Sequence, residues 1–292
     1  MSSYSADWLA LREPYDARAR NIAVCDAVVA AFADRPSITI VDLACGTGAT
    51  LRALAPRFAA QQNWRLVDND LGLLARAADG VQPRARITTV PIDLARDLEA
   101  ALDGSVDLVA TSALLDLVSE QWLERLAVEV AARRISIYAA LSYDGRIALD
   151  PSDAFDDRII GAVNSHQRRD KGFGPALGPA AVASAIARFE SLGYAVVHGD
   201  ADWVAGADDR EFQMEMLSGW ATAAREIGDL PLVDIVGWLT RRRDAVAARR
   251  SSIRVGHRDF FARPLGRRWA DRSQSNSTSS SSRWTRMGAR KA

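Results

Sequence analysis

Short apolar runs alternate with longer amphipathic segments through the first half of the chain. The first run, residues 38–41, is continuous and mostly β-branched, which is typical of a strand buried on both faces of a parallel sheet. The same pattern predicts further strands at 64–67, 86–92, 106–110 and 135–141, and helices at 49–60, 70–78 and 120–133. This alternation of strands and helices indicates a parallel sheet covered by helices on both faces.

The segments on either side of this region complete the predicted fold. Before the first strand we predict two helices, 5–11 and 15–33, separated at Pro14, because proline suits the first turn of a helix. Residues 151–179 are polar and lack clear periodicity, so we predict a loop there. Later segments predict helices at 180–192, 209–226 and 232–250, and strands at 194–199 and within 252–262. The whole pattern predicts a doubly wound α/β fold with a mostly parallel seven-stranded sheet, N-terminal helices and a helical insertion before the last strand.

One domain with appendages accounts for the length of the chain. We expect an N-terminal helical cap (1–36), a ligand-binding α/β core (37–150), a substrate or lid segment (151–180), the C-terminal part of the same domain (181–263) and a tail (264–292). The tail is basic and rich in serine, a composition typical of disorder.

Charge is unevenly distributed along a chain whose formal net charge is zero. Residues 263–292 contain eight Lys or Arg and one Asp, which leaves 29 basic and 36 acidic residues in the rest. Affinity for nucleic acid comes largely from basic groups that neutralise phosphates. We therefore expect a small-molecule partner and no nucleic acid.

Several classes of protein are disfavoured by what the sequence lacks. It contains no window of about 18 or more apolar residues, as a membrane-spanning helix would require. Residues 1–20 lack the continuous apolar core of a secretory signal. Cys25 and Cys45 do not have metal-ligand spacing. We expect a cytoplasmic protein without a metal or a membrane partner.

The strongest chemical signal lies between residues 38 and 51. Here an apolar strand is followed by Asp42, a turn of small residues and the start of a helix. Gly46 and Gly48 have no Cβ, so the backbone can approach a ligand closely, and the helix start offers free N–H groups to a carboxylate. A dinucleotide-binding loop would have a third glycine where this chain has Leu51. A purely structural turn is the alternative interpretation.

Acidic residues also follow the next two predicted strands. Asp68 comes 26 residues after Asp42, and its carboxylate can accept hydrogen bonds from both hydroxyls of a ribose. Asp93 ends the third strand and can accept from an adenine amino group. The carboxyl ends of parallel strands meet at one edge of a sheet. Three acids at that edge suit a cationic ligand that contains adenosine.

These residues together resemble the class I S-adenosylmethionine-dependent methyltransferase family. Residues 42–48 are similar to the family's acidic, glycine-rich loop, with Ala44 in place of the first glycine, where we expect a negative φ. The resemblance covers 38–141 and extends more weakly to 262. It implies a Rossmann-like methyltransferase fold with S-adenosylmethionine as cofactor. The implied cofactor site comprises Asp42, Ala44, Cys45, Gly46, Gly48, Asp68, Asn69, Asp93, Leu94 and Thr111.

The N-terminal helices are expected to close over the cofactor, as in many members of the family. Tyr15 or Arg20 could then meet its methionyl carboxylate. The alternative is a set of solvated helix charges with Trp8 packed underneath. In this fold the loop after the fourth strand faces the transferred methyl group, so Ser112 and Asp116 are candidates for contact with substrate, although Asp116 could equally be a helix N-terminal charge.

Residues 164–175 contain an unusual concentration of polar chemistry. His166 is a candidate general base, and Arg168 and Lys171 are candidates to bind a substrate anion. Phe173 lies between two glycines, which suggests an aromatic contact carried on a hinged lid. A solvated surface loop is the alternative.

The predicted function is methyl transfer from S-adenosylmethionine to an oxygen or nitrogen of a small-molecule acceptor. The assigned catalytic candidates are His166 and Asp116, and the substrate candidates are Ser112, Arg168, Lys171 and Phe173. A non-catalytic protein that binds S-adenosylmethionine is one alternative. A nucleotide-dependent oxidoreductase is a weaker one, because the third glycine is missing.

Overall fold

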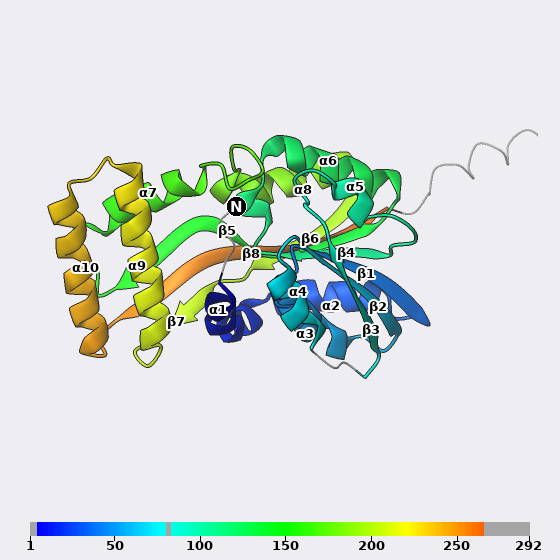
Figure 1. Ribbon diagram of the computed structural model, residues 1–292, viewed down its shortest axis with the longest axis horizontal. Coiled ribbons are helices and arrows are strands. Elements are labelled where there is room, and N and C mark those ends of the chain that lie inside the picture. Colours follow the sequence, from blue (N-terminus) through cyan, green and yellow to red (C-terminus); the bar gives the residue numbers. More distant parts are fainter. Residues whose placement is uncertain (1–4, 80–82, 266–292) are drawn as a thin grey trace, which may run out of the picture.

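The computed structural model describes residues 5–79 and 83–265. Most of the predicted disordered tail, from residue 266 onward, lies outside the described residues. The centre is an eight-stranded sheet in the order β3-β2-β1-β4-β5-β8-β6, with β7 paired to β8 (Figure 1). The strands are β1 Ser37–Leu43, β2 Gln61–Asp68, β3 Ala85–Pro91, β4 Leu108–Ser112, β5 Ser136–Asp150, β6 Tyr194–Asp200, β7 Trp203–Ala205 and β8 Ser252–Pro264.

Strands β1 to β5 are parallel, and β8 runs antiparallel to β5, β6 and β7. The predicted doubly wound, mostly parallel sheet is therefore confirmed, with the short β7 added to the seven expected strands. Strand order reverses between β1 and β4, because the chain moves outward through β2 and β3 before returning. That reversal places a crevice at the carboxyl ends of β1 and β4, where ligands of such sheets bind.

Helices cover both faces of the sheet, as Figure 1 shows. One face carries α5 Leu98–Ala101, α6 Glu120–Ala132 and α8 Ala181–Ser191, and the other carries α2 Ile22–Ala31, α3 Ala49–Leu54 and α4 Leu71–Ala78. Successive side chains of β1 point to opposite faces of the sheet and enter different hydrophobic clusters. Ile40 packs on the side of α2, α3 and α4, and Val41 packs on the side of α5, α6 and α8. Both side chains are fully buried, so the β1 backbone is held from both faces.

Strands β5 and β8 extend beyond the parallel core and carry a third hydrophobic cluster. It is formed with α1 Ala6–Ala19, α7 Asp156–Gln167, α9 Arg210–Ile227 and α10 Leu232–Ala247. In Figure 1, α7, α9 and α10 lie together at one end of the molecule, and α1 lies nearer the middle, beside β7. α9 and α10 form the helical insertion predicted before the last strand. None of the helices in the described part of the chain has the length and apolar character needed to span a bilayer.

The N-terminal helices differ from the prediction. α1 continues through Pro14 to Ala19, and the break comes at Arg20 and Asn21. Asn21 caps α2, because its side chain accepts a hydrogen bond from Val24 N at 3.1 Å. Its backbone N–H also donates to Asp259 Oδ2 at 2.9 Å in β8. The hydrogen bond from Asn21 to Asp259 joins residues far apart in the sequence, so the local sequence does not reveal it. This bond helps to set the boundary between α1 and α2.

The region after the fifth strand also differs from the prediction. The predicted strand ended at residue 141, but β5 continues to Asp150 because β8 remains beside it, with register shifts after Ala139 and Tyr143. The predicted loop contains α7 instead. Ile159, Ala162 and Val163 are buried at helical spacing on its inner face. The predicted helix 49–60 ends early, since Pro56 begins a turn of 3₁₀ helix, η1 Ala55–Arg57.

Candidate functional site

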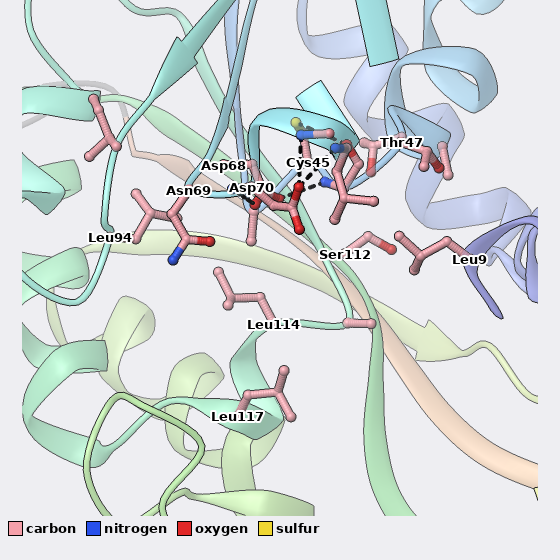
Figure 2. A pocket seen from close by; sticks show the side chains of 18 of the residues that line it. Leu9, Cys45, Thr47, Asp68, Asn69, Asp70, Leu94, Ser112, Leu114 and Leu117 are labelled. Carbon is pink, nitrogen blue, oxygen red and sulfur yellow. Dashed lines mark hydrogen bonds between the residues drawn. The ribbon is translucent and has the colours of Figure 1, made fainter. Parts of the chain in front are cut away.

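A cavity of about 680 Å³ lies at the carboxyl ends of β1, β2, β3 and β4 (Figure 2). Ten of the predicted site residues line it: Ala44, Cys45, Gly46, Asp68, Asn69, Asp93, Leu94, Ser112, Lys171 and Phe173. Eight do not: Tyr15, Arg20, Asp42, Gly48, Thr111, Asp116, His166 and Arg168. The cavity therefore brings together residues predicted for the cofactor and residues predicted for the substrate. The eight residues that do not line it make contacts elsewhere.

The turn after β1 forms one wall of the cavity. Ala44 has φ 53° and Gly46 has φ 53°, so both lie in the left-handed region. The expected negative φ at Ala44 is wrong: the turn keeps its left-handed conformation even where a methyl group makes that conformation less favourable. At Gly46 a Cβ would come within 3.2 Å of Cδ1 of Leu9, a tight contact, so the approach of α1 also favours glycine. The thiol of Cys45 has a raised pKa because it is buried, and it remains protonated.

Asp68 joins that turn to the end of β2. Its Oδ2 accepts a hydrogen bond from Gly46 N at 2.9 Å, and its Oδ1 accepts one from Asp70 N at 3.0 Å. Each carboxylate oxygen can accept a second hydrogen bond. Figure 2 shows Asp68 and Asn69 on the cavity wall opposite Leu114 and Leu117. The carboxylate is therefore held by backbone amides and can still accept from a ligand.

Asp93 and Leu94 follow β3 on the same side of the cavity. Asp93 Oδ1 accepts from Ala95 N at 3.0 Å, which fixes the turn after the strand. The backbone carbonyl of Leu94 accepts from Trp122 Nε1 at 2.7 Å, and its side chain is buried against the core. These bonds hold a carboxylate and an apolar side chain next to each other at the cavity edge.

Asp42 is fully buried in β1, behind the cavity wall. Neither of its carboxylate oxygens has a hydrogen-bond partner among the described residues. Burial raises its pKa to about 8, and the neighbouring Asp68 adds to the rise, while Arg20 opposes it. Buried polar atoms without partners are uncommon, so this carboxyl group is an unsatisfied polar group at the back of the site.

Gly48 and Thr111 support the site from behind. Gly48 has φ 83° and precedes α3, and a Cβ there would lie 3.3 Å from that of Ala77 in α4. Thr111 Oγ1 donates to the carbonyl of Leu43 at 2.9 Å, which ties β4 to the end of β1. Neither residue lines the cavity, and both pack the elements that hold the turn; their assignment as cofactor contacts stays a prediction.

The predicted N-terminal contacts do not line the cavity either. Tyr15 turns away from the cavity, where its hydroxyl donates to Asp209 Oδ1 at 2.6 Å and its ring stacks on Phe212. Arg20 is buried behind the wall and donates to Tyr138 Oη at 3.1 Å and to Ser112 Oγ at 3.4 Å. Arg20 therefore orients a residue that lines the cavity and does not line it itself.

Sequence reasoning missed the face of α1 that does line the cavity: Leu9, Arg12 and Asp16. Arg12 Nε lies 3.4 Å from Asp16 Oδ2, and both side chains are largely buried. The three residues are spaced three and four apart, so they share one face of the helix. That spacing was available in the sequence, but the predicted break at Pro14 concealed it.

The side of the cavity opposite Asp68 carries the apolar side chains of Leu114 and Leu117 (Figure 2). Phe173, Ser112 and Lys171 also line the cavity. Phe173 packs edge-on against Trp122, with ring centroids 5.4 Å apart, which anchors the segment after α7 to α6. The cavity therefore offers an apolar surface with a lysine side chain beside it.

Asp116 lies beneath this wall in the short 3₁₀ helix η2 Leu115–Leu117. It is buried, and its Oδ1 has no hydrogen-bond partner among the described residues. Burial raises its pKa to about 6, opposed by backbone hydrogen bonds and by the charges of Arg12 and Lys171. Asp116 therefore lies behind the wall and does not line the cavity, and its assignment as a catalytic residue stays a prediction.

His166 and Arg168 also differ from the prediction. Arg168 is exposed at the end of α7 and donates to the carbonyl of Asn164, so it does not reach the cavity. His166 lies in α7 and is separated from the cavity by Lys171, whose Nζ is 3.3 Å from His166 Nδ1. No group of three or more His, Cys, Asp or Glu within the described ranges has a metal-binding arrangement.

Comparison with known proteins identifies a domain in the region that forms this cavity. Residues 40–133 match the family model described as a methyltransferase domain. Similar solved structures include the cyclopropane synthase MmaA2 from Mycobacterium tuberculosis, with 12% identity, a TM-score of 0.49 and coverage of 89% of this chain and 94% of that chain. No curated protein matches the sequence at a significant level.

Another similar structure is a SAM-dependent methyltransferase from Geobacter sulfurreducens in complex with S-adenosyl-L-homocysteine, with 16% identity and a TM-score of 0.44. The alignment covers 91% of this chain and all of that chain (100%). Both structural likenesses are too distant to carry an argument about the site. The methyltransferase-domain match is different, because it runs from within β1 to the end of α6 and includes the turn, Asp68 and Asp93. Residues 40–133 are thus similar to a methyltransferase domain, which is consistent with the predicted resemblance to the class I S-adenosylmethionine-dependent methyltransferase family.

Proposed function

We propose that this enzyme transfers the methyl group of S-adenosylmethionine to an oxygen or nitrogen of a small-molecule acceptor. The observation that carries the proposal is one cavity with two chemically different ends. Asp68 lies on one side of the cavity and Leu114 and Leu117 lie on the other (Figure 2), while Asp93 and Phe173 also line it. A site of this kind can hold a polar adenosine-bearing cofactor and a largely apolar acceptor side by side.

The residues at the polar end suit the cofactor. Asp68 is held by two backbone amides and has acceptor capacity left for the ribose hydroxyls. Asp93 would take the adenine side, with Leu94 against the base. The turn at Ala44 and Gly46 would lie against the methionyl part, since its tight left-handed backbone brings peptide groups close to the cavity. Negative charge at this end favours a cationic sulfonium.

The acceptor end suggests a compact molecule with an apolar body. Leu114, Leu117 and Phe173 would contact that body, and Lys171 would meet an ionisable or anionic group on it. The rest of the chain, residues 1–262, carries more acidic than basic residues, which supports a small molecule over a nucleic acid. The segment 166–174 remains our proposed lid, since it contributes two residues to the cavity and is tied to α6 through Phe173.

The sulfonium of the cofactor supplies an already activated methyl group. The protein's contribution is then to align the acceptor atom with that group and to exclude water. The apolar wall would exclude water, and Ser112, oriented by Arg20, would help to align the acceptor. Such alignment can account for a large part of the rate enhancement.

Incubation with cofactor carrying a radiolabelled methyl group tests the proposal. The acceptor panel should contain small phenols, carboxylates and amines, with nucleic acid as a separate arm. We expect the label to move to a small molecule and S-adenosylhomocysteine to accumulate. Cofactor binding without transfer to any acceptor would favour a non-catalytic binding protein, and binding of nicotinamide nucleotides in place of S-adenosylmethionine would favour an oxidoreductase.

A further inference from the structure

A chain of three polar side chains leads from the acceptor end of the cavity to the protein surface. Lys171 lines the cavity, and its Nζ lies 3.3 Å from Nδ1 of His166. Nε2 of His166 lies 2.8 Å from Oε2 of Glu226 in α9. The exposed fraction rises from 22% for the His166 side chain to 50% for the Glu226 side chain. The three residues come from the segment after α7, from α7 itself and from α9, so tertiary packing brings them together.

The donors and acceptors in this chain are aligned in one direction. In its ammonium form Lys171 can only donate, so it then donates to Nδ1 of His166. The neutral imidazole then carries its proton on Nε2 and donates it to the Glu226 carboxylate. Each link is already a hydrogen bond, so a proton can pass outward along the chain without any side chain changing its position.

We propose that Lys171, His166 and Glu226 form a proton path from the acceptor pocket to solvent, with Lys171 as the group that takes the proton from the acceptor. This inference rests on the proposed function, since it concerns the acceptor of the same methyl transfer. It identifies the acceptor as one that loses a proton on methylation, such as a hydroxyl or a protonated nitrogen. It also gives His166 and Glu226 a positioning and relay role instead of contact with substrate.

The step balances as follows. The neutral amine of Lys171 takes the proton of the acceptor, and the electron pair left on the acceptor atom forms the bond to the methyl carbon. The bond between methyl carbon and sulfur breaks with its electrons remaining on sulfur, which neutralises the sulfonium. The ammonium then gives its proton to Nδ1 of His166, and Nε2 releases its own proton towards Glu226 and solvent.

The surroundings of Lys171 are consistent with that role. Burial lowers the pKa of Lys171, and Arg169 in the same segment lowers it further, while Glu226 in α9 and Asp116 in η2 oppose the change. Arg12 in α1 is a further charge acting on Asp116. A lower pKa makes the free amine of Lys171 more available as a base. The carboxyl groups of Glu226 and Asp116 stabilise the ammonium that forms when Lys171 takes a proton.

The path can be tested without knowing the acceptor, because the chain has only two lysines, Lys171 and Lys291. Protein labelled with ¹³C at the lysine ε carbon should give two titrating signals, and Lys171→Arg assigns them. We expect His166→Gln and Glu226→Gln each to lower the titration midpoint of Lys171 by about 0.5 pH unit, since each removes a partner that stabilises the ammonium. His198→Gln, an exposed histidine in β6, is the matched control and should leave the midpoint unchanged. A Lys171 midpoint that responds to neither variant overturns the path.

Turnover measured with an acceptor from the panel distinguishes two roles of Lys171: a base that takes the acceptor's proton, or a cation that only binds an anionic group. Lys171→Arg keeps the charge but cannot lose its proton at ordinary pH, so it should reduce kcat by about 10²-fold or more while S-adenosylhomocysteine affinity is retained. In Lys171→Ala, added methylamine should restore turnover in proportion to its free-base concentration. Wild-type turnover by Lys171→Arg contradicts the role of Lys171 as base. Failure of the wild-type protein to bind S-adenosylhomocysteine would instead contradict the proposed function, and the lysine titration would still test the path.

Discussion

The backbone amide of Gly46 donates a 2.9 Å hydrogen bond to Oδ2 of Asp68. This bond joins the turn after β1 to the end of β2, two elements that form adjoining walls of the cavity. The carboxylate and the turn are thus held in position before any ligand binds. Such preorganisation reduces the cost of ordering the site on binding.

Ala44 provides a test of the turn, because it adopts φ 53° with a side chain present. We expect Ala44→Gly to raise the free energy of unfolding by up to about 1 kcal/mol, since the left-handed strain is removed and only part of the gain is lost to the greater freedom of glycine in the unfolded chain. Urea denaturation measures the change.

The matched control is Ala187→Gly on the exposed side of α8. That substitution should lower stability by about 0.5–1 kcal/mol, as glycine does within helices. Equal destabilisation by both substitutions would show that Ala44 is not strained.

Asp42 predicts a particular dependence of stability on pH. Its folded-state pKa, raised to about 8 by burial, lies above the ordinary value near 3.9, so the folded state binds the proton more tightly than the unfolded state. This group therefore makes stability fall as pH rises, by up to about 1.4 kcal/mol per pH unit between roughly pH 4 and pH 8, and the fall levels off above pH 8.

Asp42→Asn removes that titration. Denaturation curves at about pH 5 and about pH 8 should show a smaller loss of stability for the variant than for the wild type. The comparison isolates Asp42, because other buried acids such as Asp16, Asp116 and Asp259 titrate in both proteins. An identical pH dependence in the two proteins would mean that Asp42 is ionised in the fold at neutral pH.

Much of the site could be predicted from local sequence because its residues follow strands directly. Asp68 and Asp93 lie at the ends of two strands, and Gly46 lies in the turn after a third, so the geometry of a parallel sheet is enough to bring them together. The short apolar runs identified those strands. The part of the cavity that we propose for the cofactor therefore follows from periodicity and the placement of acids.

The positions of other predicted site residues could not be foreseen, because they depend on long-range packing. Tyr15 was expected at the cofactor, but Asp209 and Phe212, almost two hundred residues away in sequence, hold it elsewhere. His166 was expected at the substrate, but α7 and α9 bring it to Glu226 and behind Lys171. No local pattern indicates such partners.

Tyr15 offers a test of that correction. Tyr15→Phe removes a hydroxyl that donates to Asp209 at 2.6 Å, so stability should fall by about 1–2 kcal/mol, while affinity for S-adenosylhomocysteine should be unchanged. Thermal unfolding and calorimetric titration measure the two effects separately. Arg12→Met, in a residue that lines the cavity, is the comparison and should weaken binding. A large loss of affinity for S-adenosylhomocysteine in Tyr15→Phe would show that Tyr15 contributes to the cofactor site.

The most direct test of the cofactor assignment is calorimetric titration of S-adenosylhomocysteine into wild type, Asp68→Ala and Asp79→Ala. Asp79 is exposed at the end of α4 and serves as the control carboxylate. We expect the wild type and Asp79→Ala to bind alike, and Asp68→Ala to lose about 2–3 kcal/mol of binding free energy, or roughly 30- to 150-fold in Kd, because two hydroxyl contacts and the anchor of the turn are lost together. Wild-type affinity in a folded Asp68→Ala protein would contradict the account.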